Sequence, residues 1–405
     1  MQELLFLAHR IPYPPNKGDK IRSFNLLKHL ARDYRVHLGT FVDDAHDWRY
    51  LPDVKALCAE TCFVALHPGR ARLRSIVGLA TGEPLSLPFY RSAVLQQWVD
   101  RLLAGGGVRR ALVFSAAMAQ YVAGKRPGLR RVLDFVDMDS DKWRQYAAGS
   151  RWPLRAIYRR EARQLFRYER RMANTFEAST FVSEAEAQLF VRHAPEAAAR
   201  VGYVDNGVDT DYFSAARDYP NPYAPEERVL VFTGAMDYWA NVDAVSWFAR
   251  QVFPAIRAQA GDARFYVVGA RPTREVQRLA ALPGVLVTGA VADIRPYLAH
   301  ARAAVAPLRI ARGVQNKVLE AMAMARPVLA SSQAMDGIRT CPGIEALVSD
   351  TPAAMAQQAL MLLSAADVDE YGRRGRACVL QHYNWTANLR RIEHLLESAE
   401  RPPSG

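Results

Sequence analysis

An apolar stretch, a glycine-containing loop and a helical pattern follow one another in residues 303–325, and this order can build an anion site. The apolar stretch ends at Pro307, the loop contains Gly313, and apolar residues then keep the spacing of one helix face up to Ala325. The first turn of a helix presents unpaired backbone N–H groups and the positive end of the helix dipole. The segment therefore predicts a phosphate-binding site at a helix that begins near Val314 or Gln315.

Two charged side chains on this predicted helix could complete such a site. Lys317 lies in the first turn and can supply a cation. Glu320 lies one turn further, where a carboxylate can accept hydrogen bonds from vicinal hydroxyls. A diphosphate followed by a ribose fits that order of groups. Strand–loop–helix units with an ordinary surface lysine and glutamate are common, so spacing alone leaves both interpretations open.

Residues 134–141 are a second candidate site because they are rich in aspartate and come at the end of the strand expected at 131–135. Asp137 and Asp139 should lie at the strand's end. One interpretation is a metal site, although Lys142 stands where a calcium loop requires glycine. The interpretation that we favour is recognition of sugar or acceptor hydroxyls by Asp137. A helix N-cap role for Asp139 or Ser140 is the structural alternative.

Short apolar runs alternate with longer helical patterns along the whole chain, which predicts an α/β fold with parallel sheets. A proline-rich segment at 219–227 separates two such halves and is the expected linker. We expect two Rossmann-like, doubly wound domains facing across a cleft, with ligands at the carboxyl ends of strands. Expected helices include 20–32 and 92–103. The expected strands are 4–8, 36–41, 62–66, 111–114, 131–135 and 180–182, then 229–233, 263–268, 285–288, 303–306, 327–330 and 346–348.

Length and composition agree with two globular domains. The chain has 405 residues, which suits two domains of about 200 residues each. No run approaches the roughly 20 apolar residues of a membrane helix, and the N-terminal apolar run indicates a buried strand rather than a signal peptide. The four cysteines form no CxxC pair and lie near no histidine cluster. We therefore expect neither disulfides nor structural zinc, and a cytoplasmic location.

The formal net charge of +12 is concentrated between Arg151 and Arg171. Arg155, Arg159 and Arg163 follow at i, i+4 and i+8, so they share one face of a predicted helix and form a cationic stripe. Such a helix could lie on an anionic membrane surface, bind an anionic carrier, or be a solvated face. No nucleic-acid module is visible, and we expect no nucleic-acid partner.

The second half resembles the group 1 (family 4) retaining glycosyltransferases. That family's donor-site motif has two glutamates eight residues apart, followed by an Ala-Met-Ala run and Pro-Val. Glu320–Ala323 and Pro327–Val328 match its second half. Other segments match in the family's order: Asn206–Asp209, Phe232–Gly234, Val267–Gly269, Gly289–Ile294 and Trp385.

The resemblance implies a GT-B fold, with an acceptor domain at 1–215, a donor domain at 225–383, and a C-terminal helix at 384–405 that crosses back to the first domain. It implies a UDP- or GDP-sugar as donor substrate and no metal or other cofactor. We expect donor contacts from Gly18, Gly234, Gly269, Val291, Arg309, Gly313, Asn316 and Glu320. We expect the catalytic residues to be Asp137, Arg312 and Lys317.

Two departures from the family pattern affect this expectation. Arg312 stands where most relatives have the first glutamate, and residues 234–237 lack the usual Gly-Arg-Leu, with no basic residue before Arg250. We expect Arg309, Arg312 and Lys317 to replace the missing cations. Two alternatives are a non-catalytic sugar-nucleotide-binding or scaffold subunit and a sugar-nucleotide epimerase.

Residues 9–25 and 134–143 resemble a narrower group, the glycosyltransferases that accompany exosortase (PEP-CTERM) systems and exopolysaccharide synthesis. This resemblance implies transfer to a glycan on a lipid carrier by a cytoplasmic protein, peripheral on the inner membrane. An anionic membrane surface is then an expected partner, which suits the arginine stripe.

Overall fold

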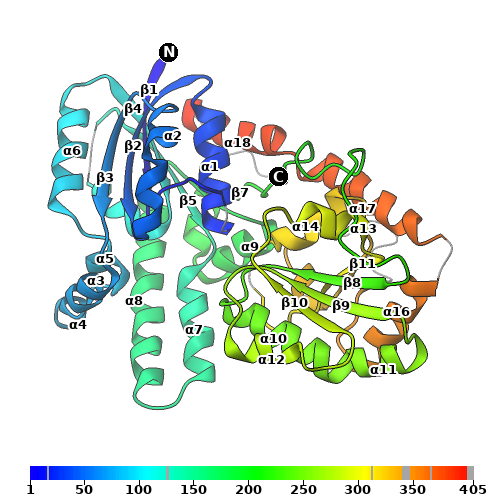
Figure 1. The fold of residues 1–405 in the computed structure, drawn as a ribbon. Coiled ribbons are helices and arrows are strands. Elements are labelled where there is room, and N and C mark those ends of the chain that lie inside the picture. Colours follow the sequence, from blue (N-terminus) through cyan, green and yellow to red (C-terminus); the bar gives the residue numbers. More distant parts are fainter. Residues whose placement is uncertain (16–17, 125–126, 312, 340–346, 365–366, 399–405) are drawn as a thin grey trace. The chain divides into compact units, whose positions relative to one another are not determined.

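The computed structural model describes residues 1–398 except 16–17, 125–126, 312, 340–346 and 365–366. The chain divides into two compact units. Unit 1 contains residues 1–205 and 386–405, and unit 2 contains residues 206–385. Each unit is built on a parallel sheet with helices on its faces (Figure 1).

Unit 1 contains a seven-stranded sheet in the order β3-β2-β1-β4-β5-β6-β7. All neighbouring strands are parallel, and the order reverses between β1 and β4, as in doubly wound folds. Six strands had been expected, and each is found with slightly different ends. The strands are β1 Gln2–Ala8, β2 Tyr34–Val42, β3 Glu60–Ala65, β4 Val108–Phe114, β5 Arg130–Val136, β6 Ala178–Phe181 and the unexpected β7 Val201–Tyr203.

Helices cover both faces of this sheet because the strands are apolar on both sides. α6 packs so closely over β2 that a Cβ on Gly39 would lie 2.8 Å from side-chain atoms of Leu7 and Leu95. Ser92 caps α6 by accepting a hydrogen bond from the N–H of Leu95. The helices of unit 1 are α1 Gly18–Leu30, α2 Leu51–Lys55, α3 Pro68–Ser75, α4 Val77–Thr81, α5 Ser86–Phe89, α6 Ala93–Ala104, α7 Asp139–Gly149, α8 Leu154–Thr175, α9 Glu184–His193 and the C-terminal α18 Trp385–Glu397.

The C-terminal helix α18 packs on unit 1, although the chain reaches it from unit 2. Glu397 accepts hydrogen bonds from Tyr34 and Arg110, and the carbonyl of Leu395 accepts one from Nε of Arg130. These contacts place the end of α18 beside the starts of β2, β4 and β5. The expected return of the chain to the first domain is therefore present in the structure.

Unit 2 contains a five-stranded parallel sheet in the order β10-β9-β8-β11-β12. Its strands are β8 Arg228–Thr233, β9 Ala263–Val268, β10 Val285–Gly289, β11 Ala303–Ala306 and β12 Val328–Ala330. The expected strand 346–348 is reduced to one bridge between Val348 and Ala330, and residue 346 lies outside the described residues. The helices are α10 Trp239–Trp247, α11 Phe253–Gln259, α12 Arg274–Leu279, α13 Arg295–His300, α14 Asn316–Ala323, α15 Ser332–Met335, α16 Pro352–Ser364 and α17 Val368–His382.

Two expectations differ from the structure. Residues 206–227 belong to unit 2 rather than to the first domain and a linker, because Val208 donates its N–H to the carbonyl of Tyr383 and the buried Tyr223 donates its hydroxyl to the carbonyl of Tyr297. Proline therefore marks a packed loop here. Cys378 is disulfide-bonded, whereas Cys58 and Cys62 are free, so the expectation of no disulfide is wrong.

Candidate active site

The loop after β11 and the first turn of α14 form the centre of the candidate site in unit 2. Gly313 has a φ of 63°, which glycine adopts without strain, and its carbonyl accepts a hydrogen bond from Nε2 of Gln315 at 3.0 Å. In the described part of the chain, no side chain caps α14, and Oδ1 of Asn316 is buried without a hydrogen-bond partner. The start of α14 therefore offers backbone N–H groups to an anion, beside a polar group that a ligand could satisfy.

Lys317 projects from this turn toward the end of β8. Its Nζ donates a hydrogen bond of 2.7 Å to Oδ1 of Asn241 and lies 4.9 Å from the ring centroid of Phe232. Asn241 in turn donates from Nδ2 to the carbonyl of Ala235 at 2.9 Å. Burial lowers the pKa of Lys317 to about 8, because removing the ammonium from water costs free energy that Glu320 only partly offsets. The site therefore holds one cation that an anionic ligand would stabilise.

Glu320 follows Lys317 by three residues on the same face of α14 and is half-buried. Burial raises its pKa to about 7, and the nearby Lys317 ammonium opposes that rise. The carboxylate is therefore poorly solvated. Hydroxyl donors from a ligand would lower the cost of its charge.

Two glycines bring the ends of β8 and β9 unusually close. A Cβ on Gly269 would lie 1.7 Å from the carbonyl oxygen of Gly234, and one on Gly234 would lie 2.8 Å from Nδ2 of Asn241 and 3.5 Å from Cε of Lys317. The N–H of Gly234 is bonded to the carbonyl of Val268. Gly234 therefore belongs to the same site as Lys317. Gly269 has no side chain to displace the backbone of Gly234, so the two strand ends can pack in contact.

The loop after β10, which contains Val291, carries a stacked ion pair. Arg295 pairs with Asp293 at 2.6 Å, and its guanidinium carbon lies 3.8 Å from the ring centroid of Tyr212. Val291 itself is half-buried in this loop. The segment containing Tyr212 is thereby held against the loop that follows β10.

The two arginines expected beside Lys317 have different outcomes. Arg309 is half-exposed and forms an ion pair with Asp243 of α10, with its guanidinium 6.0 Å from the ring centroid of Trp247. Arg312 lies outside the described residues. At the start of α14, the Lys317 ammonium therefore bonds to the amide of Asn241 rather than to a carboxylate.

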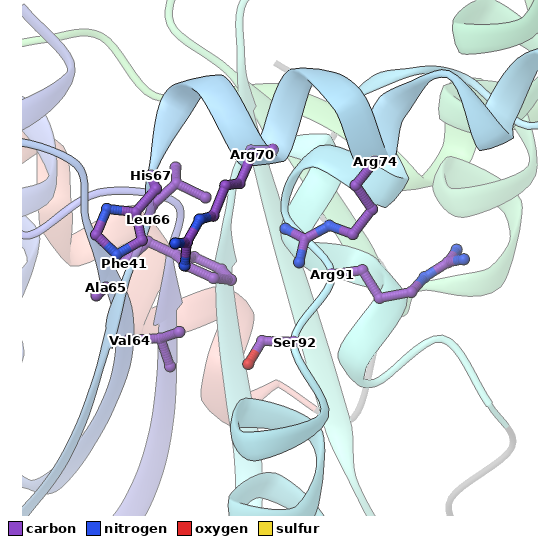
Figure 2. Close-up of a pocket in the computed structure, with 10 residues that line it drawn as sticks. Phe41, Val64, Ala65, Leu66, His67, Arg70, Arg74, Arg91 and Ser92 are labelled. Carbon is purple, nitrogen blue, oxygen red and sulfur yellow. The ribbon is translucent and has the colours of Figure 1, made fainter.

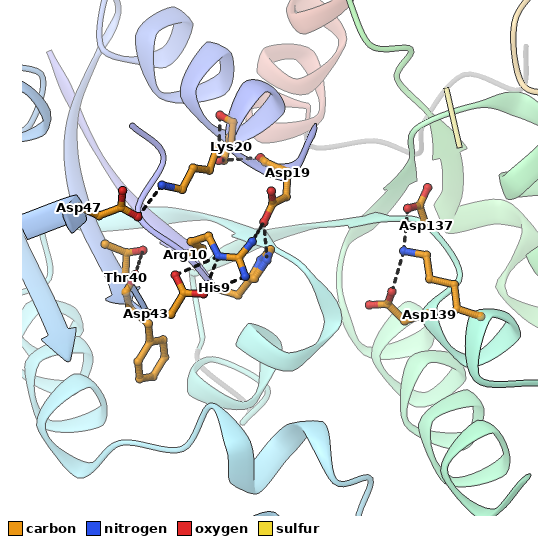
Figure 3. Close-up of polar contacts among 12 residues, drawn as sticks. His9, Arg10, Asp19, Lys20, Thr40, Asp43, Asp47, Asp137 and Asp139 are labelled. Carbon is orange, nitrogen blue, oxygen red and sulfur yellow. Dashed lines mark hydrogen bonds and ion pairs between the residues drawn. The ribbon is translucent and has the colours of Figure 1, made fainter. Parts of the chain in front are cut away.

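In unit 1, Asp137 follows β5 and pairs with Lys142, whose Nζ lies 2.8 Å from Oδ2 of Asp137 and 3.1 Å from Oδ1 of Asp139 (Figure 3). Burial alone would lower the pKa of Lys142, but the two carboxylates raise it well above its ordinary value. Oδ1 of Asp137 is buried without a hydrogen-bond partner in the described structure. Among the residues that the structure describes, no three His, Cys, Asp or Glu side chains are grouped so that they could hold a metal ion.

Gly18 is the exposed first residue of α1, and the loop before it holds a polar cluster (Figure 3). Arg10 contacts Asp19 at 2.5 Å and Asp43 at 2.9 Å, and Nε2 of His9 lies 3.3 Å from Asp19. Burial would raise the pKa of Asp19, but the hydrogen bond with His9 and the Arg10 charge outweigh it and lower the pKa. His9 and Arg10 are therefore held by charge pairs at the carboxyl ends of β1 and β2.

Residues 227–365 match the family model described as Glycosyl transferases group 1. This match covers α14, Lys317 and Glu320. Unit 2 matches the group 1 glycosyltransferases. A search of curated proteins finds no matching sequence.

Several solved structures share the fold over 98% of this chain. A sucrose-phosphate synthase from Thermosynechococcus elongatus has 16% identity and a TM-score of 0.69, with 98% of each chain covered. HepE from Anabaena, solved with UDP and glucose, has 14% identity and a TM-score of 0.63, covering 98% of this chain and 100% of HepE. WaaG, a glycosyltransferase involved in lipopolysaccharide biosynthesis, has 14% identity and a TM-score of 0.64 at the same coverage. The fold is therefore the GT-B fold.

The residues expected to bind the donor or to act in catalysis thus lie in both units. The structure brings Gly234, Asn316, Lys317 and Glu320 together around the start of α14. Gly18 and Asp137 lie in unit 1. Asn241 was missed by sequence reasoning, although its position in the first turn of the helix after Gly234 was a usable signal.

Proposed function

We propose that this protein is a retaining glycosyltransferase that moves a sugar from a UDP- or GDP-sugar to a lipid-linked glycan in exopolysaccharide synthesis. The observation that carries the proposal is the half-buried Lys317–Glu320 pair beside Gly234, at the uncapped start of α14 in the domain that matches group 1 glycosyltransferases. A diphosphate and a ribose suit these two charges in that order.

In this proposal, the bond between the anomeric carbon and the diphosphate oxygen breaks, and its electron pair passes to the diphosphate. The Lys317 ammonium and the backbone N–H groups of α14 stabilise that charge. The acceptor hydroxyl oxygen bonds to the anomeric carbon on the face that the diphosphate leaves, and its proton passes to a diphosphate oxygen. Glu320 holds the ribose hydroxyls throughout, and Asp137 is assigned to the sugar or acceptor hydroxyls.

The transfer is proposed to need no metal, because Lys317, the start of α14 and Arg309 would neutralise the diphosphate, with Arg312 assigned the same role from its place in the sequence. The lipid-linked acceptor implies a cytoplasmic protein held peripherally on the inner membrane. No helix in the described chain is long and apolar enough to cross a bilayer.

The test is release of nucleoside diphosphate from UDP- and GDP-sugars, measured with polyprenyl-phosphate-linked acceptors and with EDTA present. The proposal predicts acceptor-dependent release that EDTA leaves intact. Donor binding without release on any acceptor would instead favour a non-catalytic subunit. Donor conversion without an acceptor would favour an epimerase.

A further inference from the structure

Exposed apolar side chains of unit 1 are concentrated in two segments. Among the described residues, 17 large hydrophobic side chains are exposed, and seven of them lie in residues 73–79 and 152–157. Trp152 is 84% exposed and Leu73 is 69% exposed. The seven are Leu73, Ile76, Val77, Leu79, Trp152, Leu154 and Ile157. Large apolar side chains clustered on an exposed surface usually mark a site that binds another protein, a membrane or a ligand.

Backbone-directed hydrogen bonds join these two segments into one surface. Arg160 of α8 donates to the carbonyl of Gly78 in α4 at 2.5 Å and to the carbonyl of Glu83 at 3.3 Å. The adjacent Glu161 is buried and accepts the N–H of Leu85 at 2.8 Å. Ile157 precedes Arg160 by one helical turn, so it lies on the side of α8 that faces α4. The α3–α4 segment and the start of α8 are therefore held side by side.

This surface is also strongly cationic. Residues 67–79 and 151–163 contain eight arginines and one acid, the buried Glu161. The arginines are Arg70, Arg72, Arg74, Arg151, Arg155, Arg159, Arg160 and Arg163. The arginine stripe on α8 is thus one half of a larger feature, which we call the apolar–arginine surface and define as residues 67–79 and 151–163.

A small cavity adjoins this surface under α3. Its volume is about 130 Å³, and its lining includes Arg70, Arg74, Arg91 and Ser92 together with the apolar Phe41 and Val64. In Figure 2, Arg70 extends from α3 toward His67 and Phe41, whereas the guanidinium of Arg91 points away from Arg70 and Arg74. Arg74 donates to the carbonyls of Pro88 and Phe89, and Arg91 pairs with Glu83. Among the described residues that line the cavity, Arg70 is the guanidinium that could meet a phosphate group attached to an apolar chain.

We propose that the apolar–arginine surface docks on an anionic phospholipid bilayer, with Trp152 and the α3–α4 side chains inserted at the headgroup level and the arginines bound to lipid phosphates. Aromatic and aliphatic groups next to arginine are the pattern of interfacial membrane binding. A second copy of this chain is disfavoured, because a two-fold contact through this surface would place arginines against arginines. The inference rests on the proposed function only in expecting a membrane near the acceptor.

The experiment measures sedimentation of the full chain with phosphatidylcholine vesicles that contain or lack phosphatidylglycerol. The wild type is expected to bind the anionic vesicles only. Leu73→Ser with Ile76→Ser should weaken binding by about tenfold or more, and Arg155→Gln with Arg159→Gln and Arg163→Gln should weaken it similarly and flatten its salt dependence. The matched control is Met361→Ser with Leu380→Ser, which removes two exposed apolar groups from unit 2 and should bind like the wild type.

A second readout is quenching of tryptophan fluorescence by brominated lipid in the same vesicles, which should be largely lost in Trp152→Phe. Donor binding by each variant is measured in parallel, so a failure of the proposed function is visible separately. Anionic-vesicle binding unchanged in both surface variants, or lost equally in the control, would overturn the proposal. So would a wild-type dimer that the surface variants convert to monomers without any vesicle binding.

Discussion

Nζ of Lys317 lies 2.7 Å from Oδ1 of Asn241, and this hydrogen bond ties the first turn of α14 to the first turn of α10. Both helices follow strands that are neighbours in the sheet, β11 and β8. The ammonium is therefore positioned by an amide rather than neutralised by a carboxylate in hydrogen-bond contact. A neutral partner leaves the positive charge available to a diphosphate.

Replacing this cation should weaken donor binding. Lys317→Met is expected to reduce the affinity for a UDP- or GDP-sugar by roughly 1.5–3 kcal/mol, the usual loss for a hydrogen bond to a charged group. Arg309→Gln, which changes a second residue assigned to the diphosphate, should cost less, because Asp243 already holds that half-exposed guanidinium. Isothermal titration calorimetry measures both. An equal loss in the two variants would remove the special role assigned to Lys317.

The same lysine can be followed chemically, because it is the only lysine between residues 206 and 385. Its pKa of about 8 leaves a larger neutral fraction at pH 8 than an ordinary lysine has. Bound donor should protect Lys317 from an amine-acylating reagent, whereas labelling of the exposed Lys55 should not change. Peptide mass spectrometry quantifies both sites. Unprotected Lys317 at saturating donor would place the diphosphate elsewhere.

Donor affinity should depend on pH on both sides of neutrality. Diphosphate binding needs the Lys317 ammonium, so affinity should fall as pH rises through its pKa of about 8. Ribose recognition needs the Glu320 carboxylate, so affinity should also fall as pH decreases through its pKa of about 7. On the acidic side and on the alkaline side, the dissociation constant of the donor should rise by up to about tenfold per pH unit. Glu320→Gln should lose the acidic limb and keep the alkaline one, and an unchanged acidic limb would contradict the ribose assignment.

The contact between Gly234 and Gly269 predicts a sharp difference between two glycines of unit 2. Gly269→Ala should destabilise the protein by about 3 kcal/mol or more, because its Cβ would overlap the carbonyl of Gly234. Gly261→Ala meets nothing within 4 Å and should leave the unfolding midpoint unchanged. Urea denaturation followed by circular dichroism compares the two. Similar unfolding midpoints for the two variants would show that the backbone at Gly234 can move to make room for a Cβ on residue 269 without loss of stability.

One buried ion pair is expected to make a large contribution to the free energy of unfolding of unit 1. Nε of Arg22 donates to Oδ2 of Asp134 at 2.7 Å, and both side chains are fully buried. Asp134→Asn should cost about 3–5 kcal/mol, because it leaves a buried guanidinium without its counter-charge. Arg170→Gln, which removes an exposed ion pair with Glu196, should leave the unfolding midpoint nearly unchanged. Comparable losses in the two variants would contradict this assignment.

The periodic parts of the fold could be predicted from sequence, and the irregular parts could not. β9 and β11 have the expected bounds because each is a short apolar run between clear turns. β7 was missed since three residues carry no periodicity. Residues 219–227 looked like a linker because of their prolines, although Tyr223 packs against Tyr266 and Tyr297. Long-range packing of this kind leaves no local signal.

In the candidate site, too, residues on regular elements could be predicted from sequence, whereas contacts between distant segments were missed. Lys317 and Glu320 could be placed from sequence because both lie on one regular helix. Asn241 was missed, because its contact with Lys317 spans 76 residues of sequence and only its place in the first turn after Gly234 indicated a role. The link between α4 and α8 through Arg160 was likewise invisible, because the acceptors are backbone carbonyls that any sequence supplies.

The most direct test of the central claim is calorimetric titration of the purified protein with UDP- and GDP-sugars, alongside Glu320→Gln and the control Glu370→Gln. Glu370 is a half-exposed glutamate of α17 in the same unit. We predict that one nucleotide sugar binds the wild type and the control equally and binds Glu320→Gln more weakly by roughly 1–3 kcal/mol. Equal affinity in all three proteins, or no binding of any nucleotide sugar, would contradict a donor site at α14.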